Sequence, residues 1–303
     1  MKILTGVLLL FGSIYLVASG YILALVFIAS LVVLIAAHEA GHAYFMRKHG
    51  VEIKEFGIGI GKIGKQLFYI KAKQIRLPFL KADIPPIAFH PLLIGAYVQE
   101  TEEGTERIKA LPLKARLQIF GGGVYVNLLF AIIIYALIQV SLAIFVLLNG
   151  VEIPFDIIQN TVIATILVAI LIKWRYALSI WSPIIMGIFM IILLWVLFST
   201  PGATEAFIGP IAVITTGASI GTNSSPTAIF ELMLYVFAIS LSLGLTNSLP
   251  IPPLDGGHMA TAILKRFRVP DKILSAYRIA GLTSFVVFII FVIVNDIYKL
   301  FIR

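Results

Sequence analysis

The sequence predicts an all-α polytopic membrane protein with about seven transmembrane helices and a small membrane-associated β-sheet insert. Hydrophobic residues make up 60% of the 303 residues and charged residues only 13%, whereas soluble domains are about 45–50% apolar and about 25% charged. The apolar residues form long runs, and the first of these, residues 3–37, contains no charged side chain. A more polar segment near residues 51–99 alternates between apolar and polar residues, which is typical of short strands.

Seven apolar stretches are predicted to cross the membrane, because about 20 helical residues span the hydrocarbon core of a bilayer. The first apolar block divides at Ser19-Gly20 into two spans. The predicted spans are residues 3–18, 21–46, 119–148, 158–172, 178–198, 227–246 and 280–294. Residues 200–225, which are rich in Gly, Ser and Thr, are expected to form a short outer or re-entrant segment.

A polar insert separates the second span from the third. Its glycines, which indicate turns or close backbone approach, are Gly57, Gly59, Gly61 and Gly64. After a polar linker at residues 101–106, Thr105 is expected to cap a basic amphipathic segment. This segment is predicted to follow the membrane surface as far as Gln118, with an interruption or kink at Pro112.

Positive charge is concentrated in the insert. Thirteen of the 23 Lys and Arg residues lie between Arg47 and Arg116, together with only seven acidic residues. Because Lys and Arg accumulate in cytoplasmic loops, we expect a multi-pass protein of the cell membrane with this segment on the cytoplasmic side. Membrane topology therefore explains the net charge of +8, which does not indicate nucleic acid as a partner.

The chain divides into four expected regions. In order they are transmembrane helices at 1–50, the cytoplasmic-side β-rich insert and amphipathic segment at 51–118, further transmembrane helices at 119–225, and a last helical region at 226–303. Two polar motifs, near residues 38–42 and 247–258, fall in the first and last regions. The chemistry is therefore expected where these two motifs converge.

The first motif is His38-Glu39-Ala40-Gly41-His42, at the end of the second predicted span. Residues i and i+4 of a helix lie about 40° apart around its axis, so both imidazoles can reach one metal ion. The glutamate between them can then act on a water bound to that ion. Ionisable residues at membrane depth are costly and usually mark function. The alternative is that both histidines are bonded to neighbouring carbonyl groups.

A zinc site needs a third protein ligand and an open position for water. The chain has no cysteine, so this ligand must be His, Asp or Glu. The acids in apolar surroundings are Glu205, Glu231, Asp255 and Asp296. Asp255 is favoured because three prolines break the helix before it and Gly256-Gly257 follows, and broken helix at membrane depth requires a protein-lined or wet cavity. A simple Asp-Gly loop turn is the alternative.

Together these motifs resemble those of the site-2 protease family. The family's HExxH and NxxPxxxxDG motifs correspond to residues 38–42 and to Asn247 through Gly256. Gly57-Ile58-Gly59 is similar to the family's GxG β-loop, and residues 95–98 are similar to its GGYV strand. Residues 123–127 are similar to a GPxxN element that opens the next span, although Val124 replaces the proline.

The resemblance implies a role for each motif residue. His38, His42 and Asp255 are expected to bind one Zn²⁺ per chain, and Glu39 to serve as the general base. Asn247 is expected to position the substrate backbone or stabilise the oxyanion. A helix C-cap is the alternative for Asn247.

The implied function is zinc-dependent intramembrane proteolysis of transmembrane segments in other proteins, either in regulated proteolysis or in signal-peptide clearance. Bacterial relatives often carry PDZ domains after the second core span, whereas this chain has two added spans that could flank a substrate gate or simply face lipid. The rival interpretation is a non-catalytic membrane scaffold or a divalent-metal transporter. Substrate pairing with the Gly57–Gly61 and Gly95–Gln99 segments by strand addition is a further hypothesis.

Several other polar residues have two interpretations. His258 is expected either to support the metal ligands or to be polar lining, and His49 and His90 are expected to be interfacial and solvated. Asn127 is expected either to project towards the metal site or to form a helix-packing hydrogen bond. Trp174, Trp181 and Trp195 are expected to serve as interface anchors or in packing.

Overall fold

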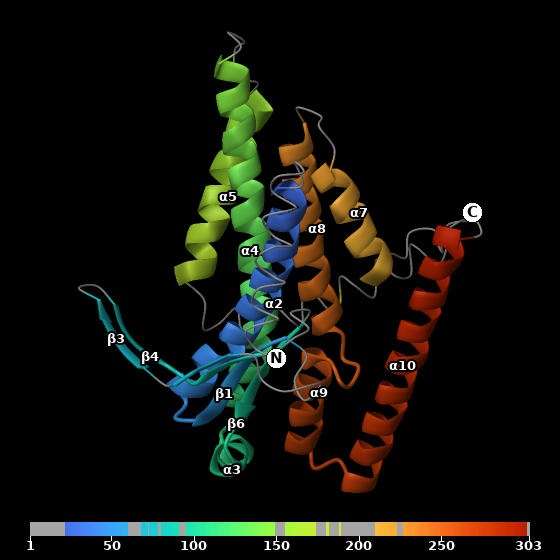
Figure 1. The fold of residues 1–303 in the computed structure, drawn as a ribbon. Helices are drawn as coiled ribbons and strands as arrows, with labels where there is room; N and C mark the ends of the chain where they lie inside the picture. The colour runs from blue at the N-terminus through green and yellow to red at the C-terminus, as the bar shows by residue number, and fades with distance from the viewer. Residues whose placement is uncertain are drawn as a thin grey trace.

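The fold is mostly helical, with a small sheet at one end of the helices (Figure 1). The computed structural model describes residues 22–59, 68–71, 73–77, 80–90, 95–148, 155–173, 180–181, 188, 210–222 and 227–301. Within them, four helices are long and apolar enough to cross a membrane. These are α2 (Ile22–Lys48), α4 (Leu113–Leu148), α8 (Ala228–Ser248) and α10 (Asp271–Phe301).

These four helices confirm four of the predicted spans. A fifth, at residues 158–172, is helical as α5 (Phe155–Lys173) but is shorter and is not among the four. The predicted span at 3–18 lies outside the described residues. Of the predicted span at 178–198, only residues 180–181 and 188 are described, so seven spans are not confirmed. An all-helical membrane-spanning scaffold fits the rule that every backbone polar group in lipid must be bonded within the protein.

Helices α2, α4 and α8 form the centre of the bundle (Figure 1). Phe27 and Leu34 of α2 pack with Leu232 and Val236 of α8 in a buried apolar cluster. Helix α5 packs against the outer side of α4, where the Tyr125 hydroxyl donates to the Leu171 carbonyl at 2.8 Å. The central three helices therefore bring residues near 40, 125 and 245 close to one another.

Helix α2 ends in a Schellman motif. Gly50 has a φ of 70°, and the Val51 amide donates to the Met46 carbonyl at 2.9 Å. Both Val51 and Met46 are buried in a second apolar cluster, together with Phe45 and Ile119. The left-handed conformation costs glycine little, so the helix can end at its basic pair, Arg47-Lys48.

The amphipathic segment begins earlier in the chain than predicted. Its first helix is α3 (Glu102–Ala110), whose N-cap is Thr101 rather than Thr105, because the Thr101 hydroxyl oxygen accepts from the Gly104 amide at 3.0 Å. The predicted break at Pro112 is confirmed, since α4 begins at the next residue. The glycines at 121–123 lie inside α4, which already begins at Leu113.

The predicted strands are confirmed as two small sheets. The four-stranded sheet has the order β2 (Phe68–Ile70), β5 (Ile87–Phe89), β1 (Ile53–Ile58) and β6 (Ala96–Glu100). Strand β1 is parallel to β5 and antiparallel to β6. A separate hairpin of β3 (Lys73–Leu77) and β4 (Leu80–Ile84) extends away from the helices (Figure 1). Strand β6 forms one edge of the larger sheet and contacts α2.

Helix α10 joins the bundle through a buried carboxylate. The Asp296 side chain is 2% exposed, and its Oδ2 accepts hydrogen bonds from the Ile211 and Ala212 amides at 3.1 and 3.0 Å. These amides belong to the first turn of α7 (Pro210–Thr222), which has a partial positive charge. Asp296 thus holds two helices together and is not a neighbour of the HExxH histidines.

Candidate metal centre

The two motif histidines lie in the last three turns of α2. His38 and His42 are both buried, with 8% of each residue exposed, and they lie one helical turn apart on the same face. His42 precedes the basic end of the helix at Lys48 by six residues, or roughly 9 Å along the axis. The site is therefore buried in protein but close to one end of the span.

Asp255 reaches the histidines from the break between α8 and α9 (Asp255–Arg266). Helix α8 ends at Ser248, the prolines at 250, 252 and 253 prevent its continuation, and α9 begins at Asp255 itself. A β-carbon on Gly257 would lie 2.4 Å from the Pro252 nitrogen, so glycine is required there for α9 to start so close to the loop. The predicted break in the helix is confirmed.

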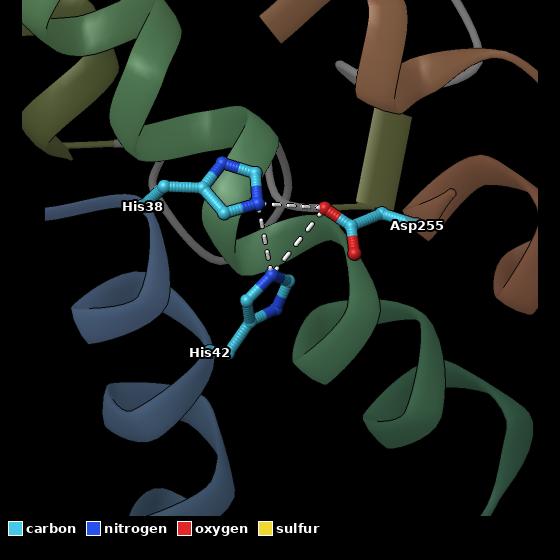
Figure 2. Close-up of side chains that lie close together, drawn as sticks. All are labelled: His38, His42 and Asp255. Carbon is cyan, nitrogen blue, oxygen red and sulfur yellow. Dashed lines mark hydrogen bonds and ion pairs between the residues drawn. The ribbon is translucent and has the colours of Figure 1, made fainter. Parts of the chain in front are cut away.

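The three side chains converge on one point (Figure 2). The Asp255 Oδ2 lies 3.0 Å from the His38 Nε2 and 3.3 Å from the His42 Nε2. The two Nε2 atoms are 3.2 Å apart. This is the one group of at least three potential metal ligands among the residues that the structure describes, and it joins positions more than two hundred residues apart.

The hydrogen bond of His42 fixes its tautomer. Its Nδ1 lies 2.7 Å from the Ile119 carbonyl oxygen, which can only accept, so Nδ1 carries the proton. In neutral His42 the Nε2 therefore presents a lone pair to Asp255 Oδ2, a buried oxygen that has no hydrogen-bond partner. Two facing acceptors are unfavourable unless a proton or a cation lies between them.

A zinc ion fits this arrangement. Ligand atoms about 2.0–2.1 Å from a tetrahedral zinc lie roughly 3.3 Å from one another, which matches the three separations. Space for the ion is kept by Gly123, because a β-carbon there would lie 2.5 Å from the Nε2 atoms of both histidines. The donor set, two imidazoles and one carboxylate, is typical of catalytic zinc sites.

Helix α4 approaches α2 closely at two further glycines. A β-carbon on Gly122 would lie 2.5 Å from the Gly41 carbonyl oxygen, and one on Gly41 would overlap the Gly122 backbone. This helix crossing was not predicted from the sequence. Small residues where two transmembrane helices touch are the signal that could have found it.

Asn127 of α4 contacts His38 on the side away from Asp255. Its side chain is 1% exposed, and its Nδ2 is placed 2.9 Å from the His38 Nδ1, while its Oδ1 has no partner. If Nε2 binds metal, Nδ1 carries the proton and must donate. If the side-chain amide of Asn127 is rotated by 180°, Oδ1 takes the place of Nδ2 and accepts this hydrogen bond. No oxygen of Asn127 is then left without a partner.

Glu39 lies between the two histidines and faces the sheet. The backbone amide of Val98 on β6 donates to its carboxylate. The position of β6 is set by Tyr97, whose hydroxyl donates to Glu55 at 2.6 Å and lies 3.0 Å from His90 Nε2. Burial, reinforced by the Glu55 carboxylate, raises the pKa of Tyr97 to about 12, so it remains a neutral donor at pH 7.

The remaining predicted residues have other described contacts. Asn247 donates through Nδ2 to the Leu243 carbonyl of its own helix at 3.0 Å. His258 is exposed and stacks on Phe120, whereas His49 bonds Gln118. Of the other candidate ligands, Glu231 accepts from Thr227 at 2.7 Å, and Glu205 lies outside the described residues.

We predict that Asn127→Leu will weaken zinc binding by about 10- to 100-fold, because the imidazole of His38 loses the partner that orients it. Asn127→Asp keeps an oxygen acceptor and should hold zinc at least as tightly as the parent. Competition with a chelator measures both affinities.

Ser240→Ala is the matched control, since Ser240 donates to the Asn127 backbone carbonyl at 2.9 Å and not to the imidazole. It should leave zinc affinity near that of the parent. Equal weakening by the Leu and Asp variants would contradict the role assigned to the Asn127 oxygen.

Comparison with known proteins finds a family model that covers most of the chain. The sequence model of Peptidase family M50 matches residues 26–293, a range that includes both motifs. A Streptococcus pneumoniae protein whose name assigns it to the zinc metalloproteases is 35% identical over 99 residues, which is 31% of this chain and 22% of that protein.

Two other relatives show a similar degree of likeness. A Nostoc protein with the same assignment is 32% identical over 95 residues, covering 30% of this chain and 25% of its own length. An Enterococcus faecalis protein whose name assigns it to the proteases is 31% identical over 98 residues, which is 31% of this chain and 20% of that protein. The matches thus span about a quarter of these curated relatives or less. Because the family model covers most of the chain, this protein belongs to Peptidase family M50, the site-2 protease family.

Proposed function

We propose that this chain is a zinc-dependent intramembrane endopeptidase that hydrolyses peptide bonds in transmembrane segments of other proteins. The observation that carries the proposal is the convergence of His38, His42 and Asp255 beside Glu39. Because this group of side chains lies near one end of an apolar helix, we expect the substrate to be embedded in the bilayer as well. We assign the active site to the cytoplasmic side on the basis of the basic residues in the adjoining insert.

Bound zinc supplies two effects, since it lowers the pKa of a bound water and polarises the carbonyl under attack. The chain's own residues supply the rest. We assign to Glu39 the transfer of a proton from the attacking water to the amine that leaves. His38, His42 and Asp255 hold the metal, and their partners at Asn127 and Ile119 keep the two imidazoles oriented.

Asn247 is proposed to position the substrate. Its side chain bonds the Leu243 carbonyl in this structure, so it must give up that hydrogen bond to contact a substrate backbone. The exchange is local, because Leu243 lies inside α8 and its carbonyl keeps the helical hydrogen bond from the Asn247 backbone amide.

A helical substrate must be extended before its backbone can be cut, and we propose that β6 binds the extended segment. The original hypothesis included the Gly57 strand, but β1 is paired on both sides and has no free edge. The Phe56 amide bonds Pro86 on the β5 side, so the alternation along β1 directs Gly57 towards Tyr97. The amides of Ala96 and Val98 therefore point away from β1, and the second of them reaches Glu39.

We predict that Glu39→Gln will lower the rate of cleavage by at least about 100-fold while zinc content and helix content stay at the parent values. Purified protein and a transmembrane peptide in detergent provide the assay. Cleavage at the parent rate would remove Glu39 from the mechanism. Zinc flux into liposomes without any peptide cleavage would instead support the transporter alternative.

We predict that Ala96→Pro will abolish cleavage of a transmembrane peptide, since it removes an outward-pointing amide from the edge that pairs with substrate. Ala96→Val adds bulk but keeps the amide, and it should retain cleavage. Zinc content should not change in either variant. Equal cleavage by the Pro variant and the parent would reject strand addition at β6.

A further inference from the structure

A cavity of about 740 Å³ opens where α2 ends, beside the start of α4. Its walls come from the end of α2, the end of α3 and the first turns of α4. The residues that line it are Lys48, His49, Gly50, Arg107, Leu111, Pro112, Lys114, Ala115 and Gln118. None of these residues belongs to the metal centre, and neither the family match nor the proposed reaction assigns the cavity a role.

The lining carries charge of one sign. Lys48, Arg107 and Lys114 are exposed cationic side chains from three different helices, and none of the nine lining residues is acidic. A concave surface lined by one sign of charge concentrates ions of the opposite sign. The first turn of α4 adds the partial positive charge of a helix N-terminus. The cavity therefore favours an anion.

The floor of the cavity is polar and fixed in place. Gln118 is 4% exposed, and its Oε1 accepts from His49 Nε2 at 2.8 Å. The Schellman motif at Gly50 fixes one wall, and the buried cluster around Phe45 and Ile119 lies next to the floor in both helices. The cations are thus held around a defined hollow instead of being spread over a flat surface.

Both helices place the cavity at the boundary between lipid and water. The apolar run of α2 ends at Arg47 and Lys48. Helix α4 has 36 residues, or roughly 54 Å, and so it is longer than the roughly 30 Å hydrocarbon core. Its first turns, with Lys114 and Arg116, therefore lie outside that core. This is the depth at which phospholipid phosphate groups are found.

We propose that this cavity binds the phosphate group of an anionic phospholipid. Lys and Arg donate charge-assisted hydrogen bonds to phosphate oxygens, and basic pockets between transmembrane helices are suited to lipid headgroups. Free phosphate has the same chemistry at the oxygens and is the second possible source of the ligand. Arg107 and Lys114 are exposed, so a ligand from either source can reach them.

The cavity is linked to the metal centre through two adjacent residues of α4. Gln118 forms its floor, and the next residue, Ile119, provides the carbonyl that fixes the tautomer of His42. A headgroup bound here would therefore act on the backbone that orients a metal ligand. The binding proposal stands apart from the proposed proteolysis, because it requires no chemistry at zinc.

The test measures thermal unfolding of the full chain in non-ionic detergent with three probes, namely dioctanoyl phosphatidylglycerol, dioctanoyl phosphatidylcholine and inorganic phosphate. The triple variant Lys48→Gln, Arg107→Gln, Lys114→Gln removes the cavity cations. The triple variant Lys265→Gln, Arg266→Gln, Lys272→Gln, called the loop triple variant, removes equal charge from the helix ends on either side of the loop between α9 and α10. Glu39→Gln, which disables the proposed reaction, is run in parallel.

Phosphatidylglycerol should stabilise the parent, the loop triple variant and Glu39→Gln with the same saturable midpoint. The cavity triple variant should need at least about tenfold more lipid, since each cation contributes about fivefold near an anionic surface. A saturable effect of inorganic phosphate with the same dependence on the three cations would assign the site to free phosphate. Equal weakening by both triple variants, or equal stabilisation by phosphatidylcholine, would overturn the proposal.

Discussion

The structure depends on a buried contact between three groups that can all act as acceptors. His42 uses its proton on the Ile119 carbonyl, so its Nε2 faces Asp255 Oδ2 at 3.3 Å with a lone pair. His38 Nε2 lies 3.0 Å from Asp255 Oδ2 and 3.2 Å from His42 Nε2. Leaving a buried acceptor unpaired costs about 1–3 kcal/mol, and more for a charged group. A shared cation removes this cost, which is why the arrangement is best understood as a metal site.

The helix scaffold is built around that contact. Gly41 and Gly122 allow α2 and α4 to touch along their backbones, and Gly123 leaves room beside both imidazoles. The proline loop before α9 brings Asp255 to the same point from the other end of the chain. Zinc binding therefore connects residues distant in sequence, so that the free energy of metal binding also stabilises the bundle.

The sequence predicted the metal centre better than it predicted the elements around it. The HExxH spacing fixes two ligands on one helical face, and the Pro and Gly residues around Asp255 indicate a helix break, because both are local properties. The same Pro and Gly residues favoured Asp255 over Asp296, which is buried elsewhere and caps α7. The partners of the histidines, Asn127 and Ile119, depend on how α4 crosses α2, which no local pattern encodes.

The sheet shows the same division between local and tertiary information. Alternating residues indicated strands at 51–99, but strand order depends on pairing between distant segments, and it places β1 inside the sheet. The Thr101 cap was missed because Thr101 and Thr105 are both plausible caps, and only the position of the Gly104 amide distinguishes them. The cationic cavity could not be predicted either, because its three cations come from separate helices.

The zinc content of purified parent and variant chains tests the account most directly. We expect about one zinc per chain in the parent, loss of zinc in Asp255→Ala, and retention of zinc in Asp296→Asn, whose amide oxygen can still accept hydrogen bonds from the α7 amides. Zinc K-edge absorption of the parent should show two imidazole nitrogens and at least one oxygen at about 2.0–2.1 Å. Full retention of zinc by Asp255→Ala in a folded chain would contradict the central claim.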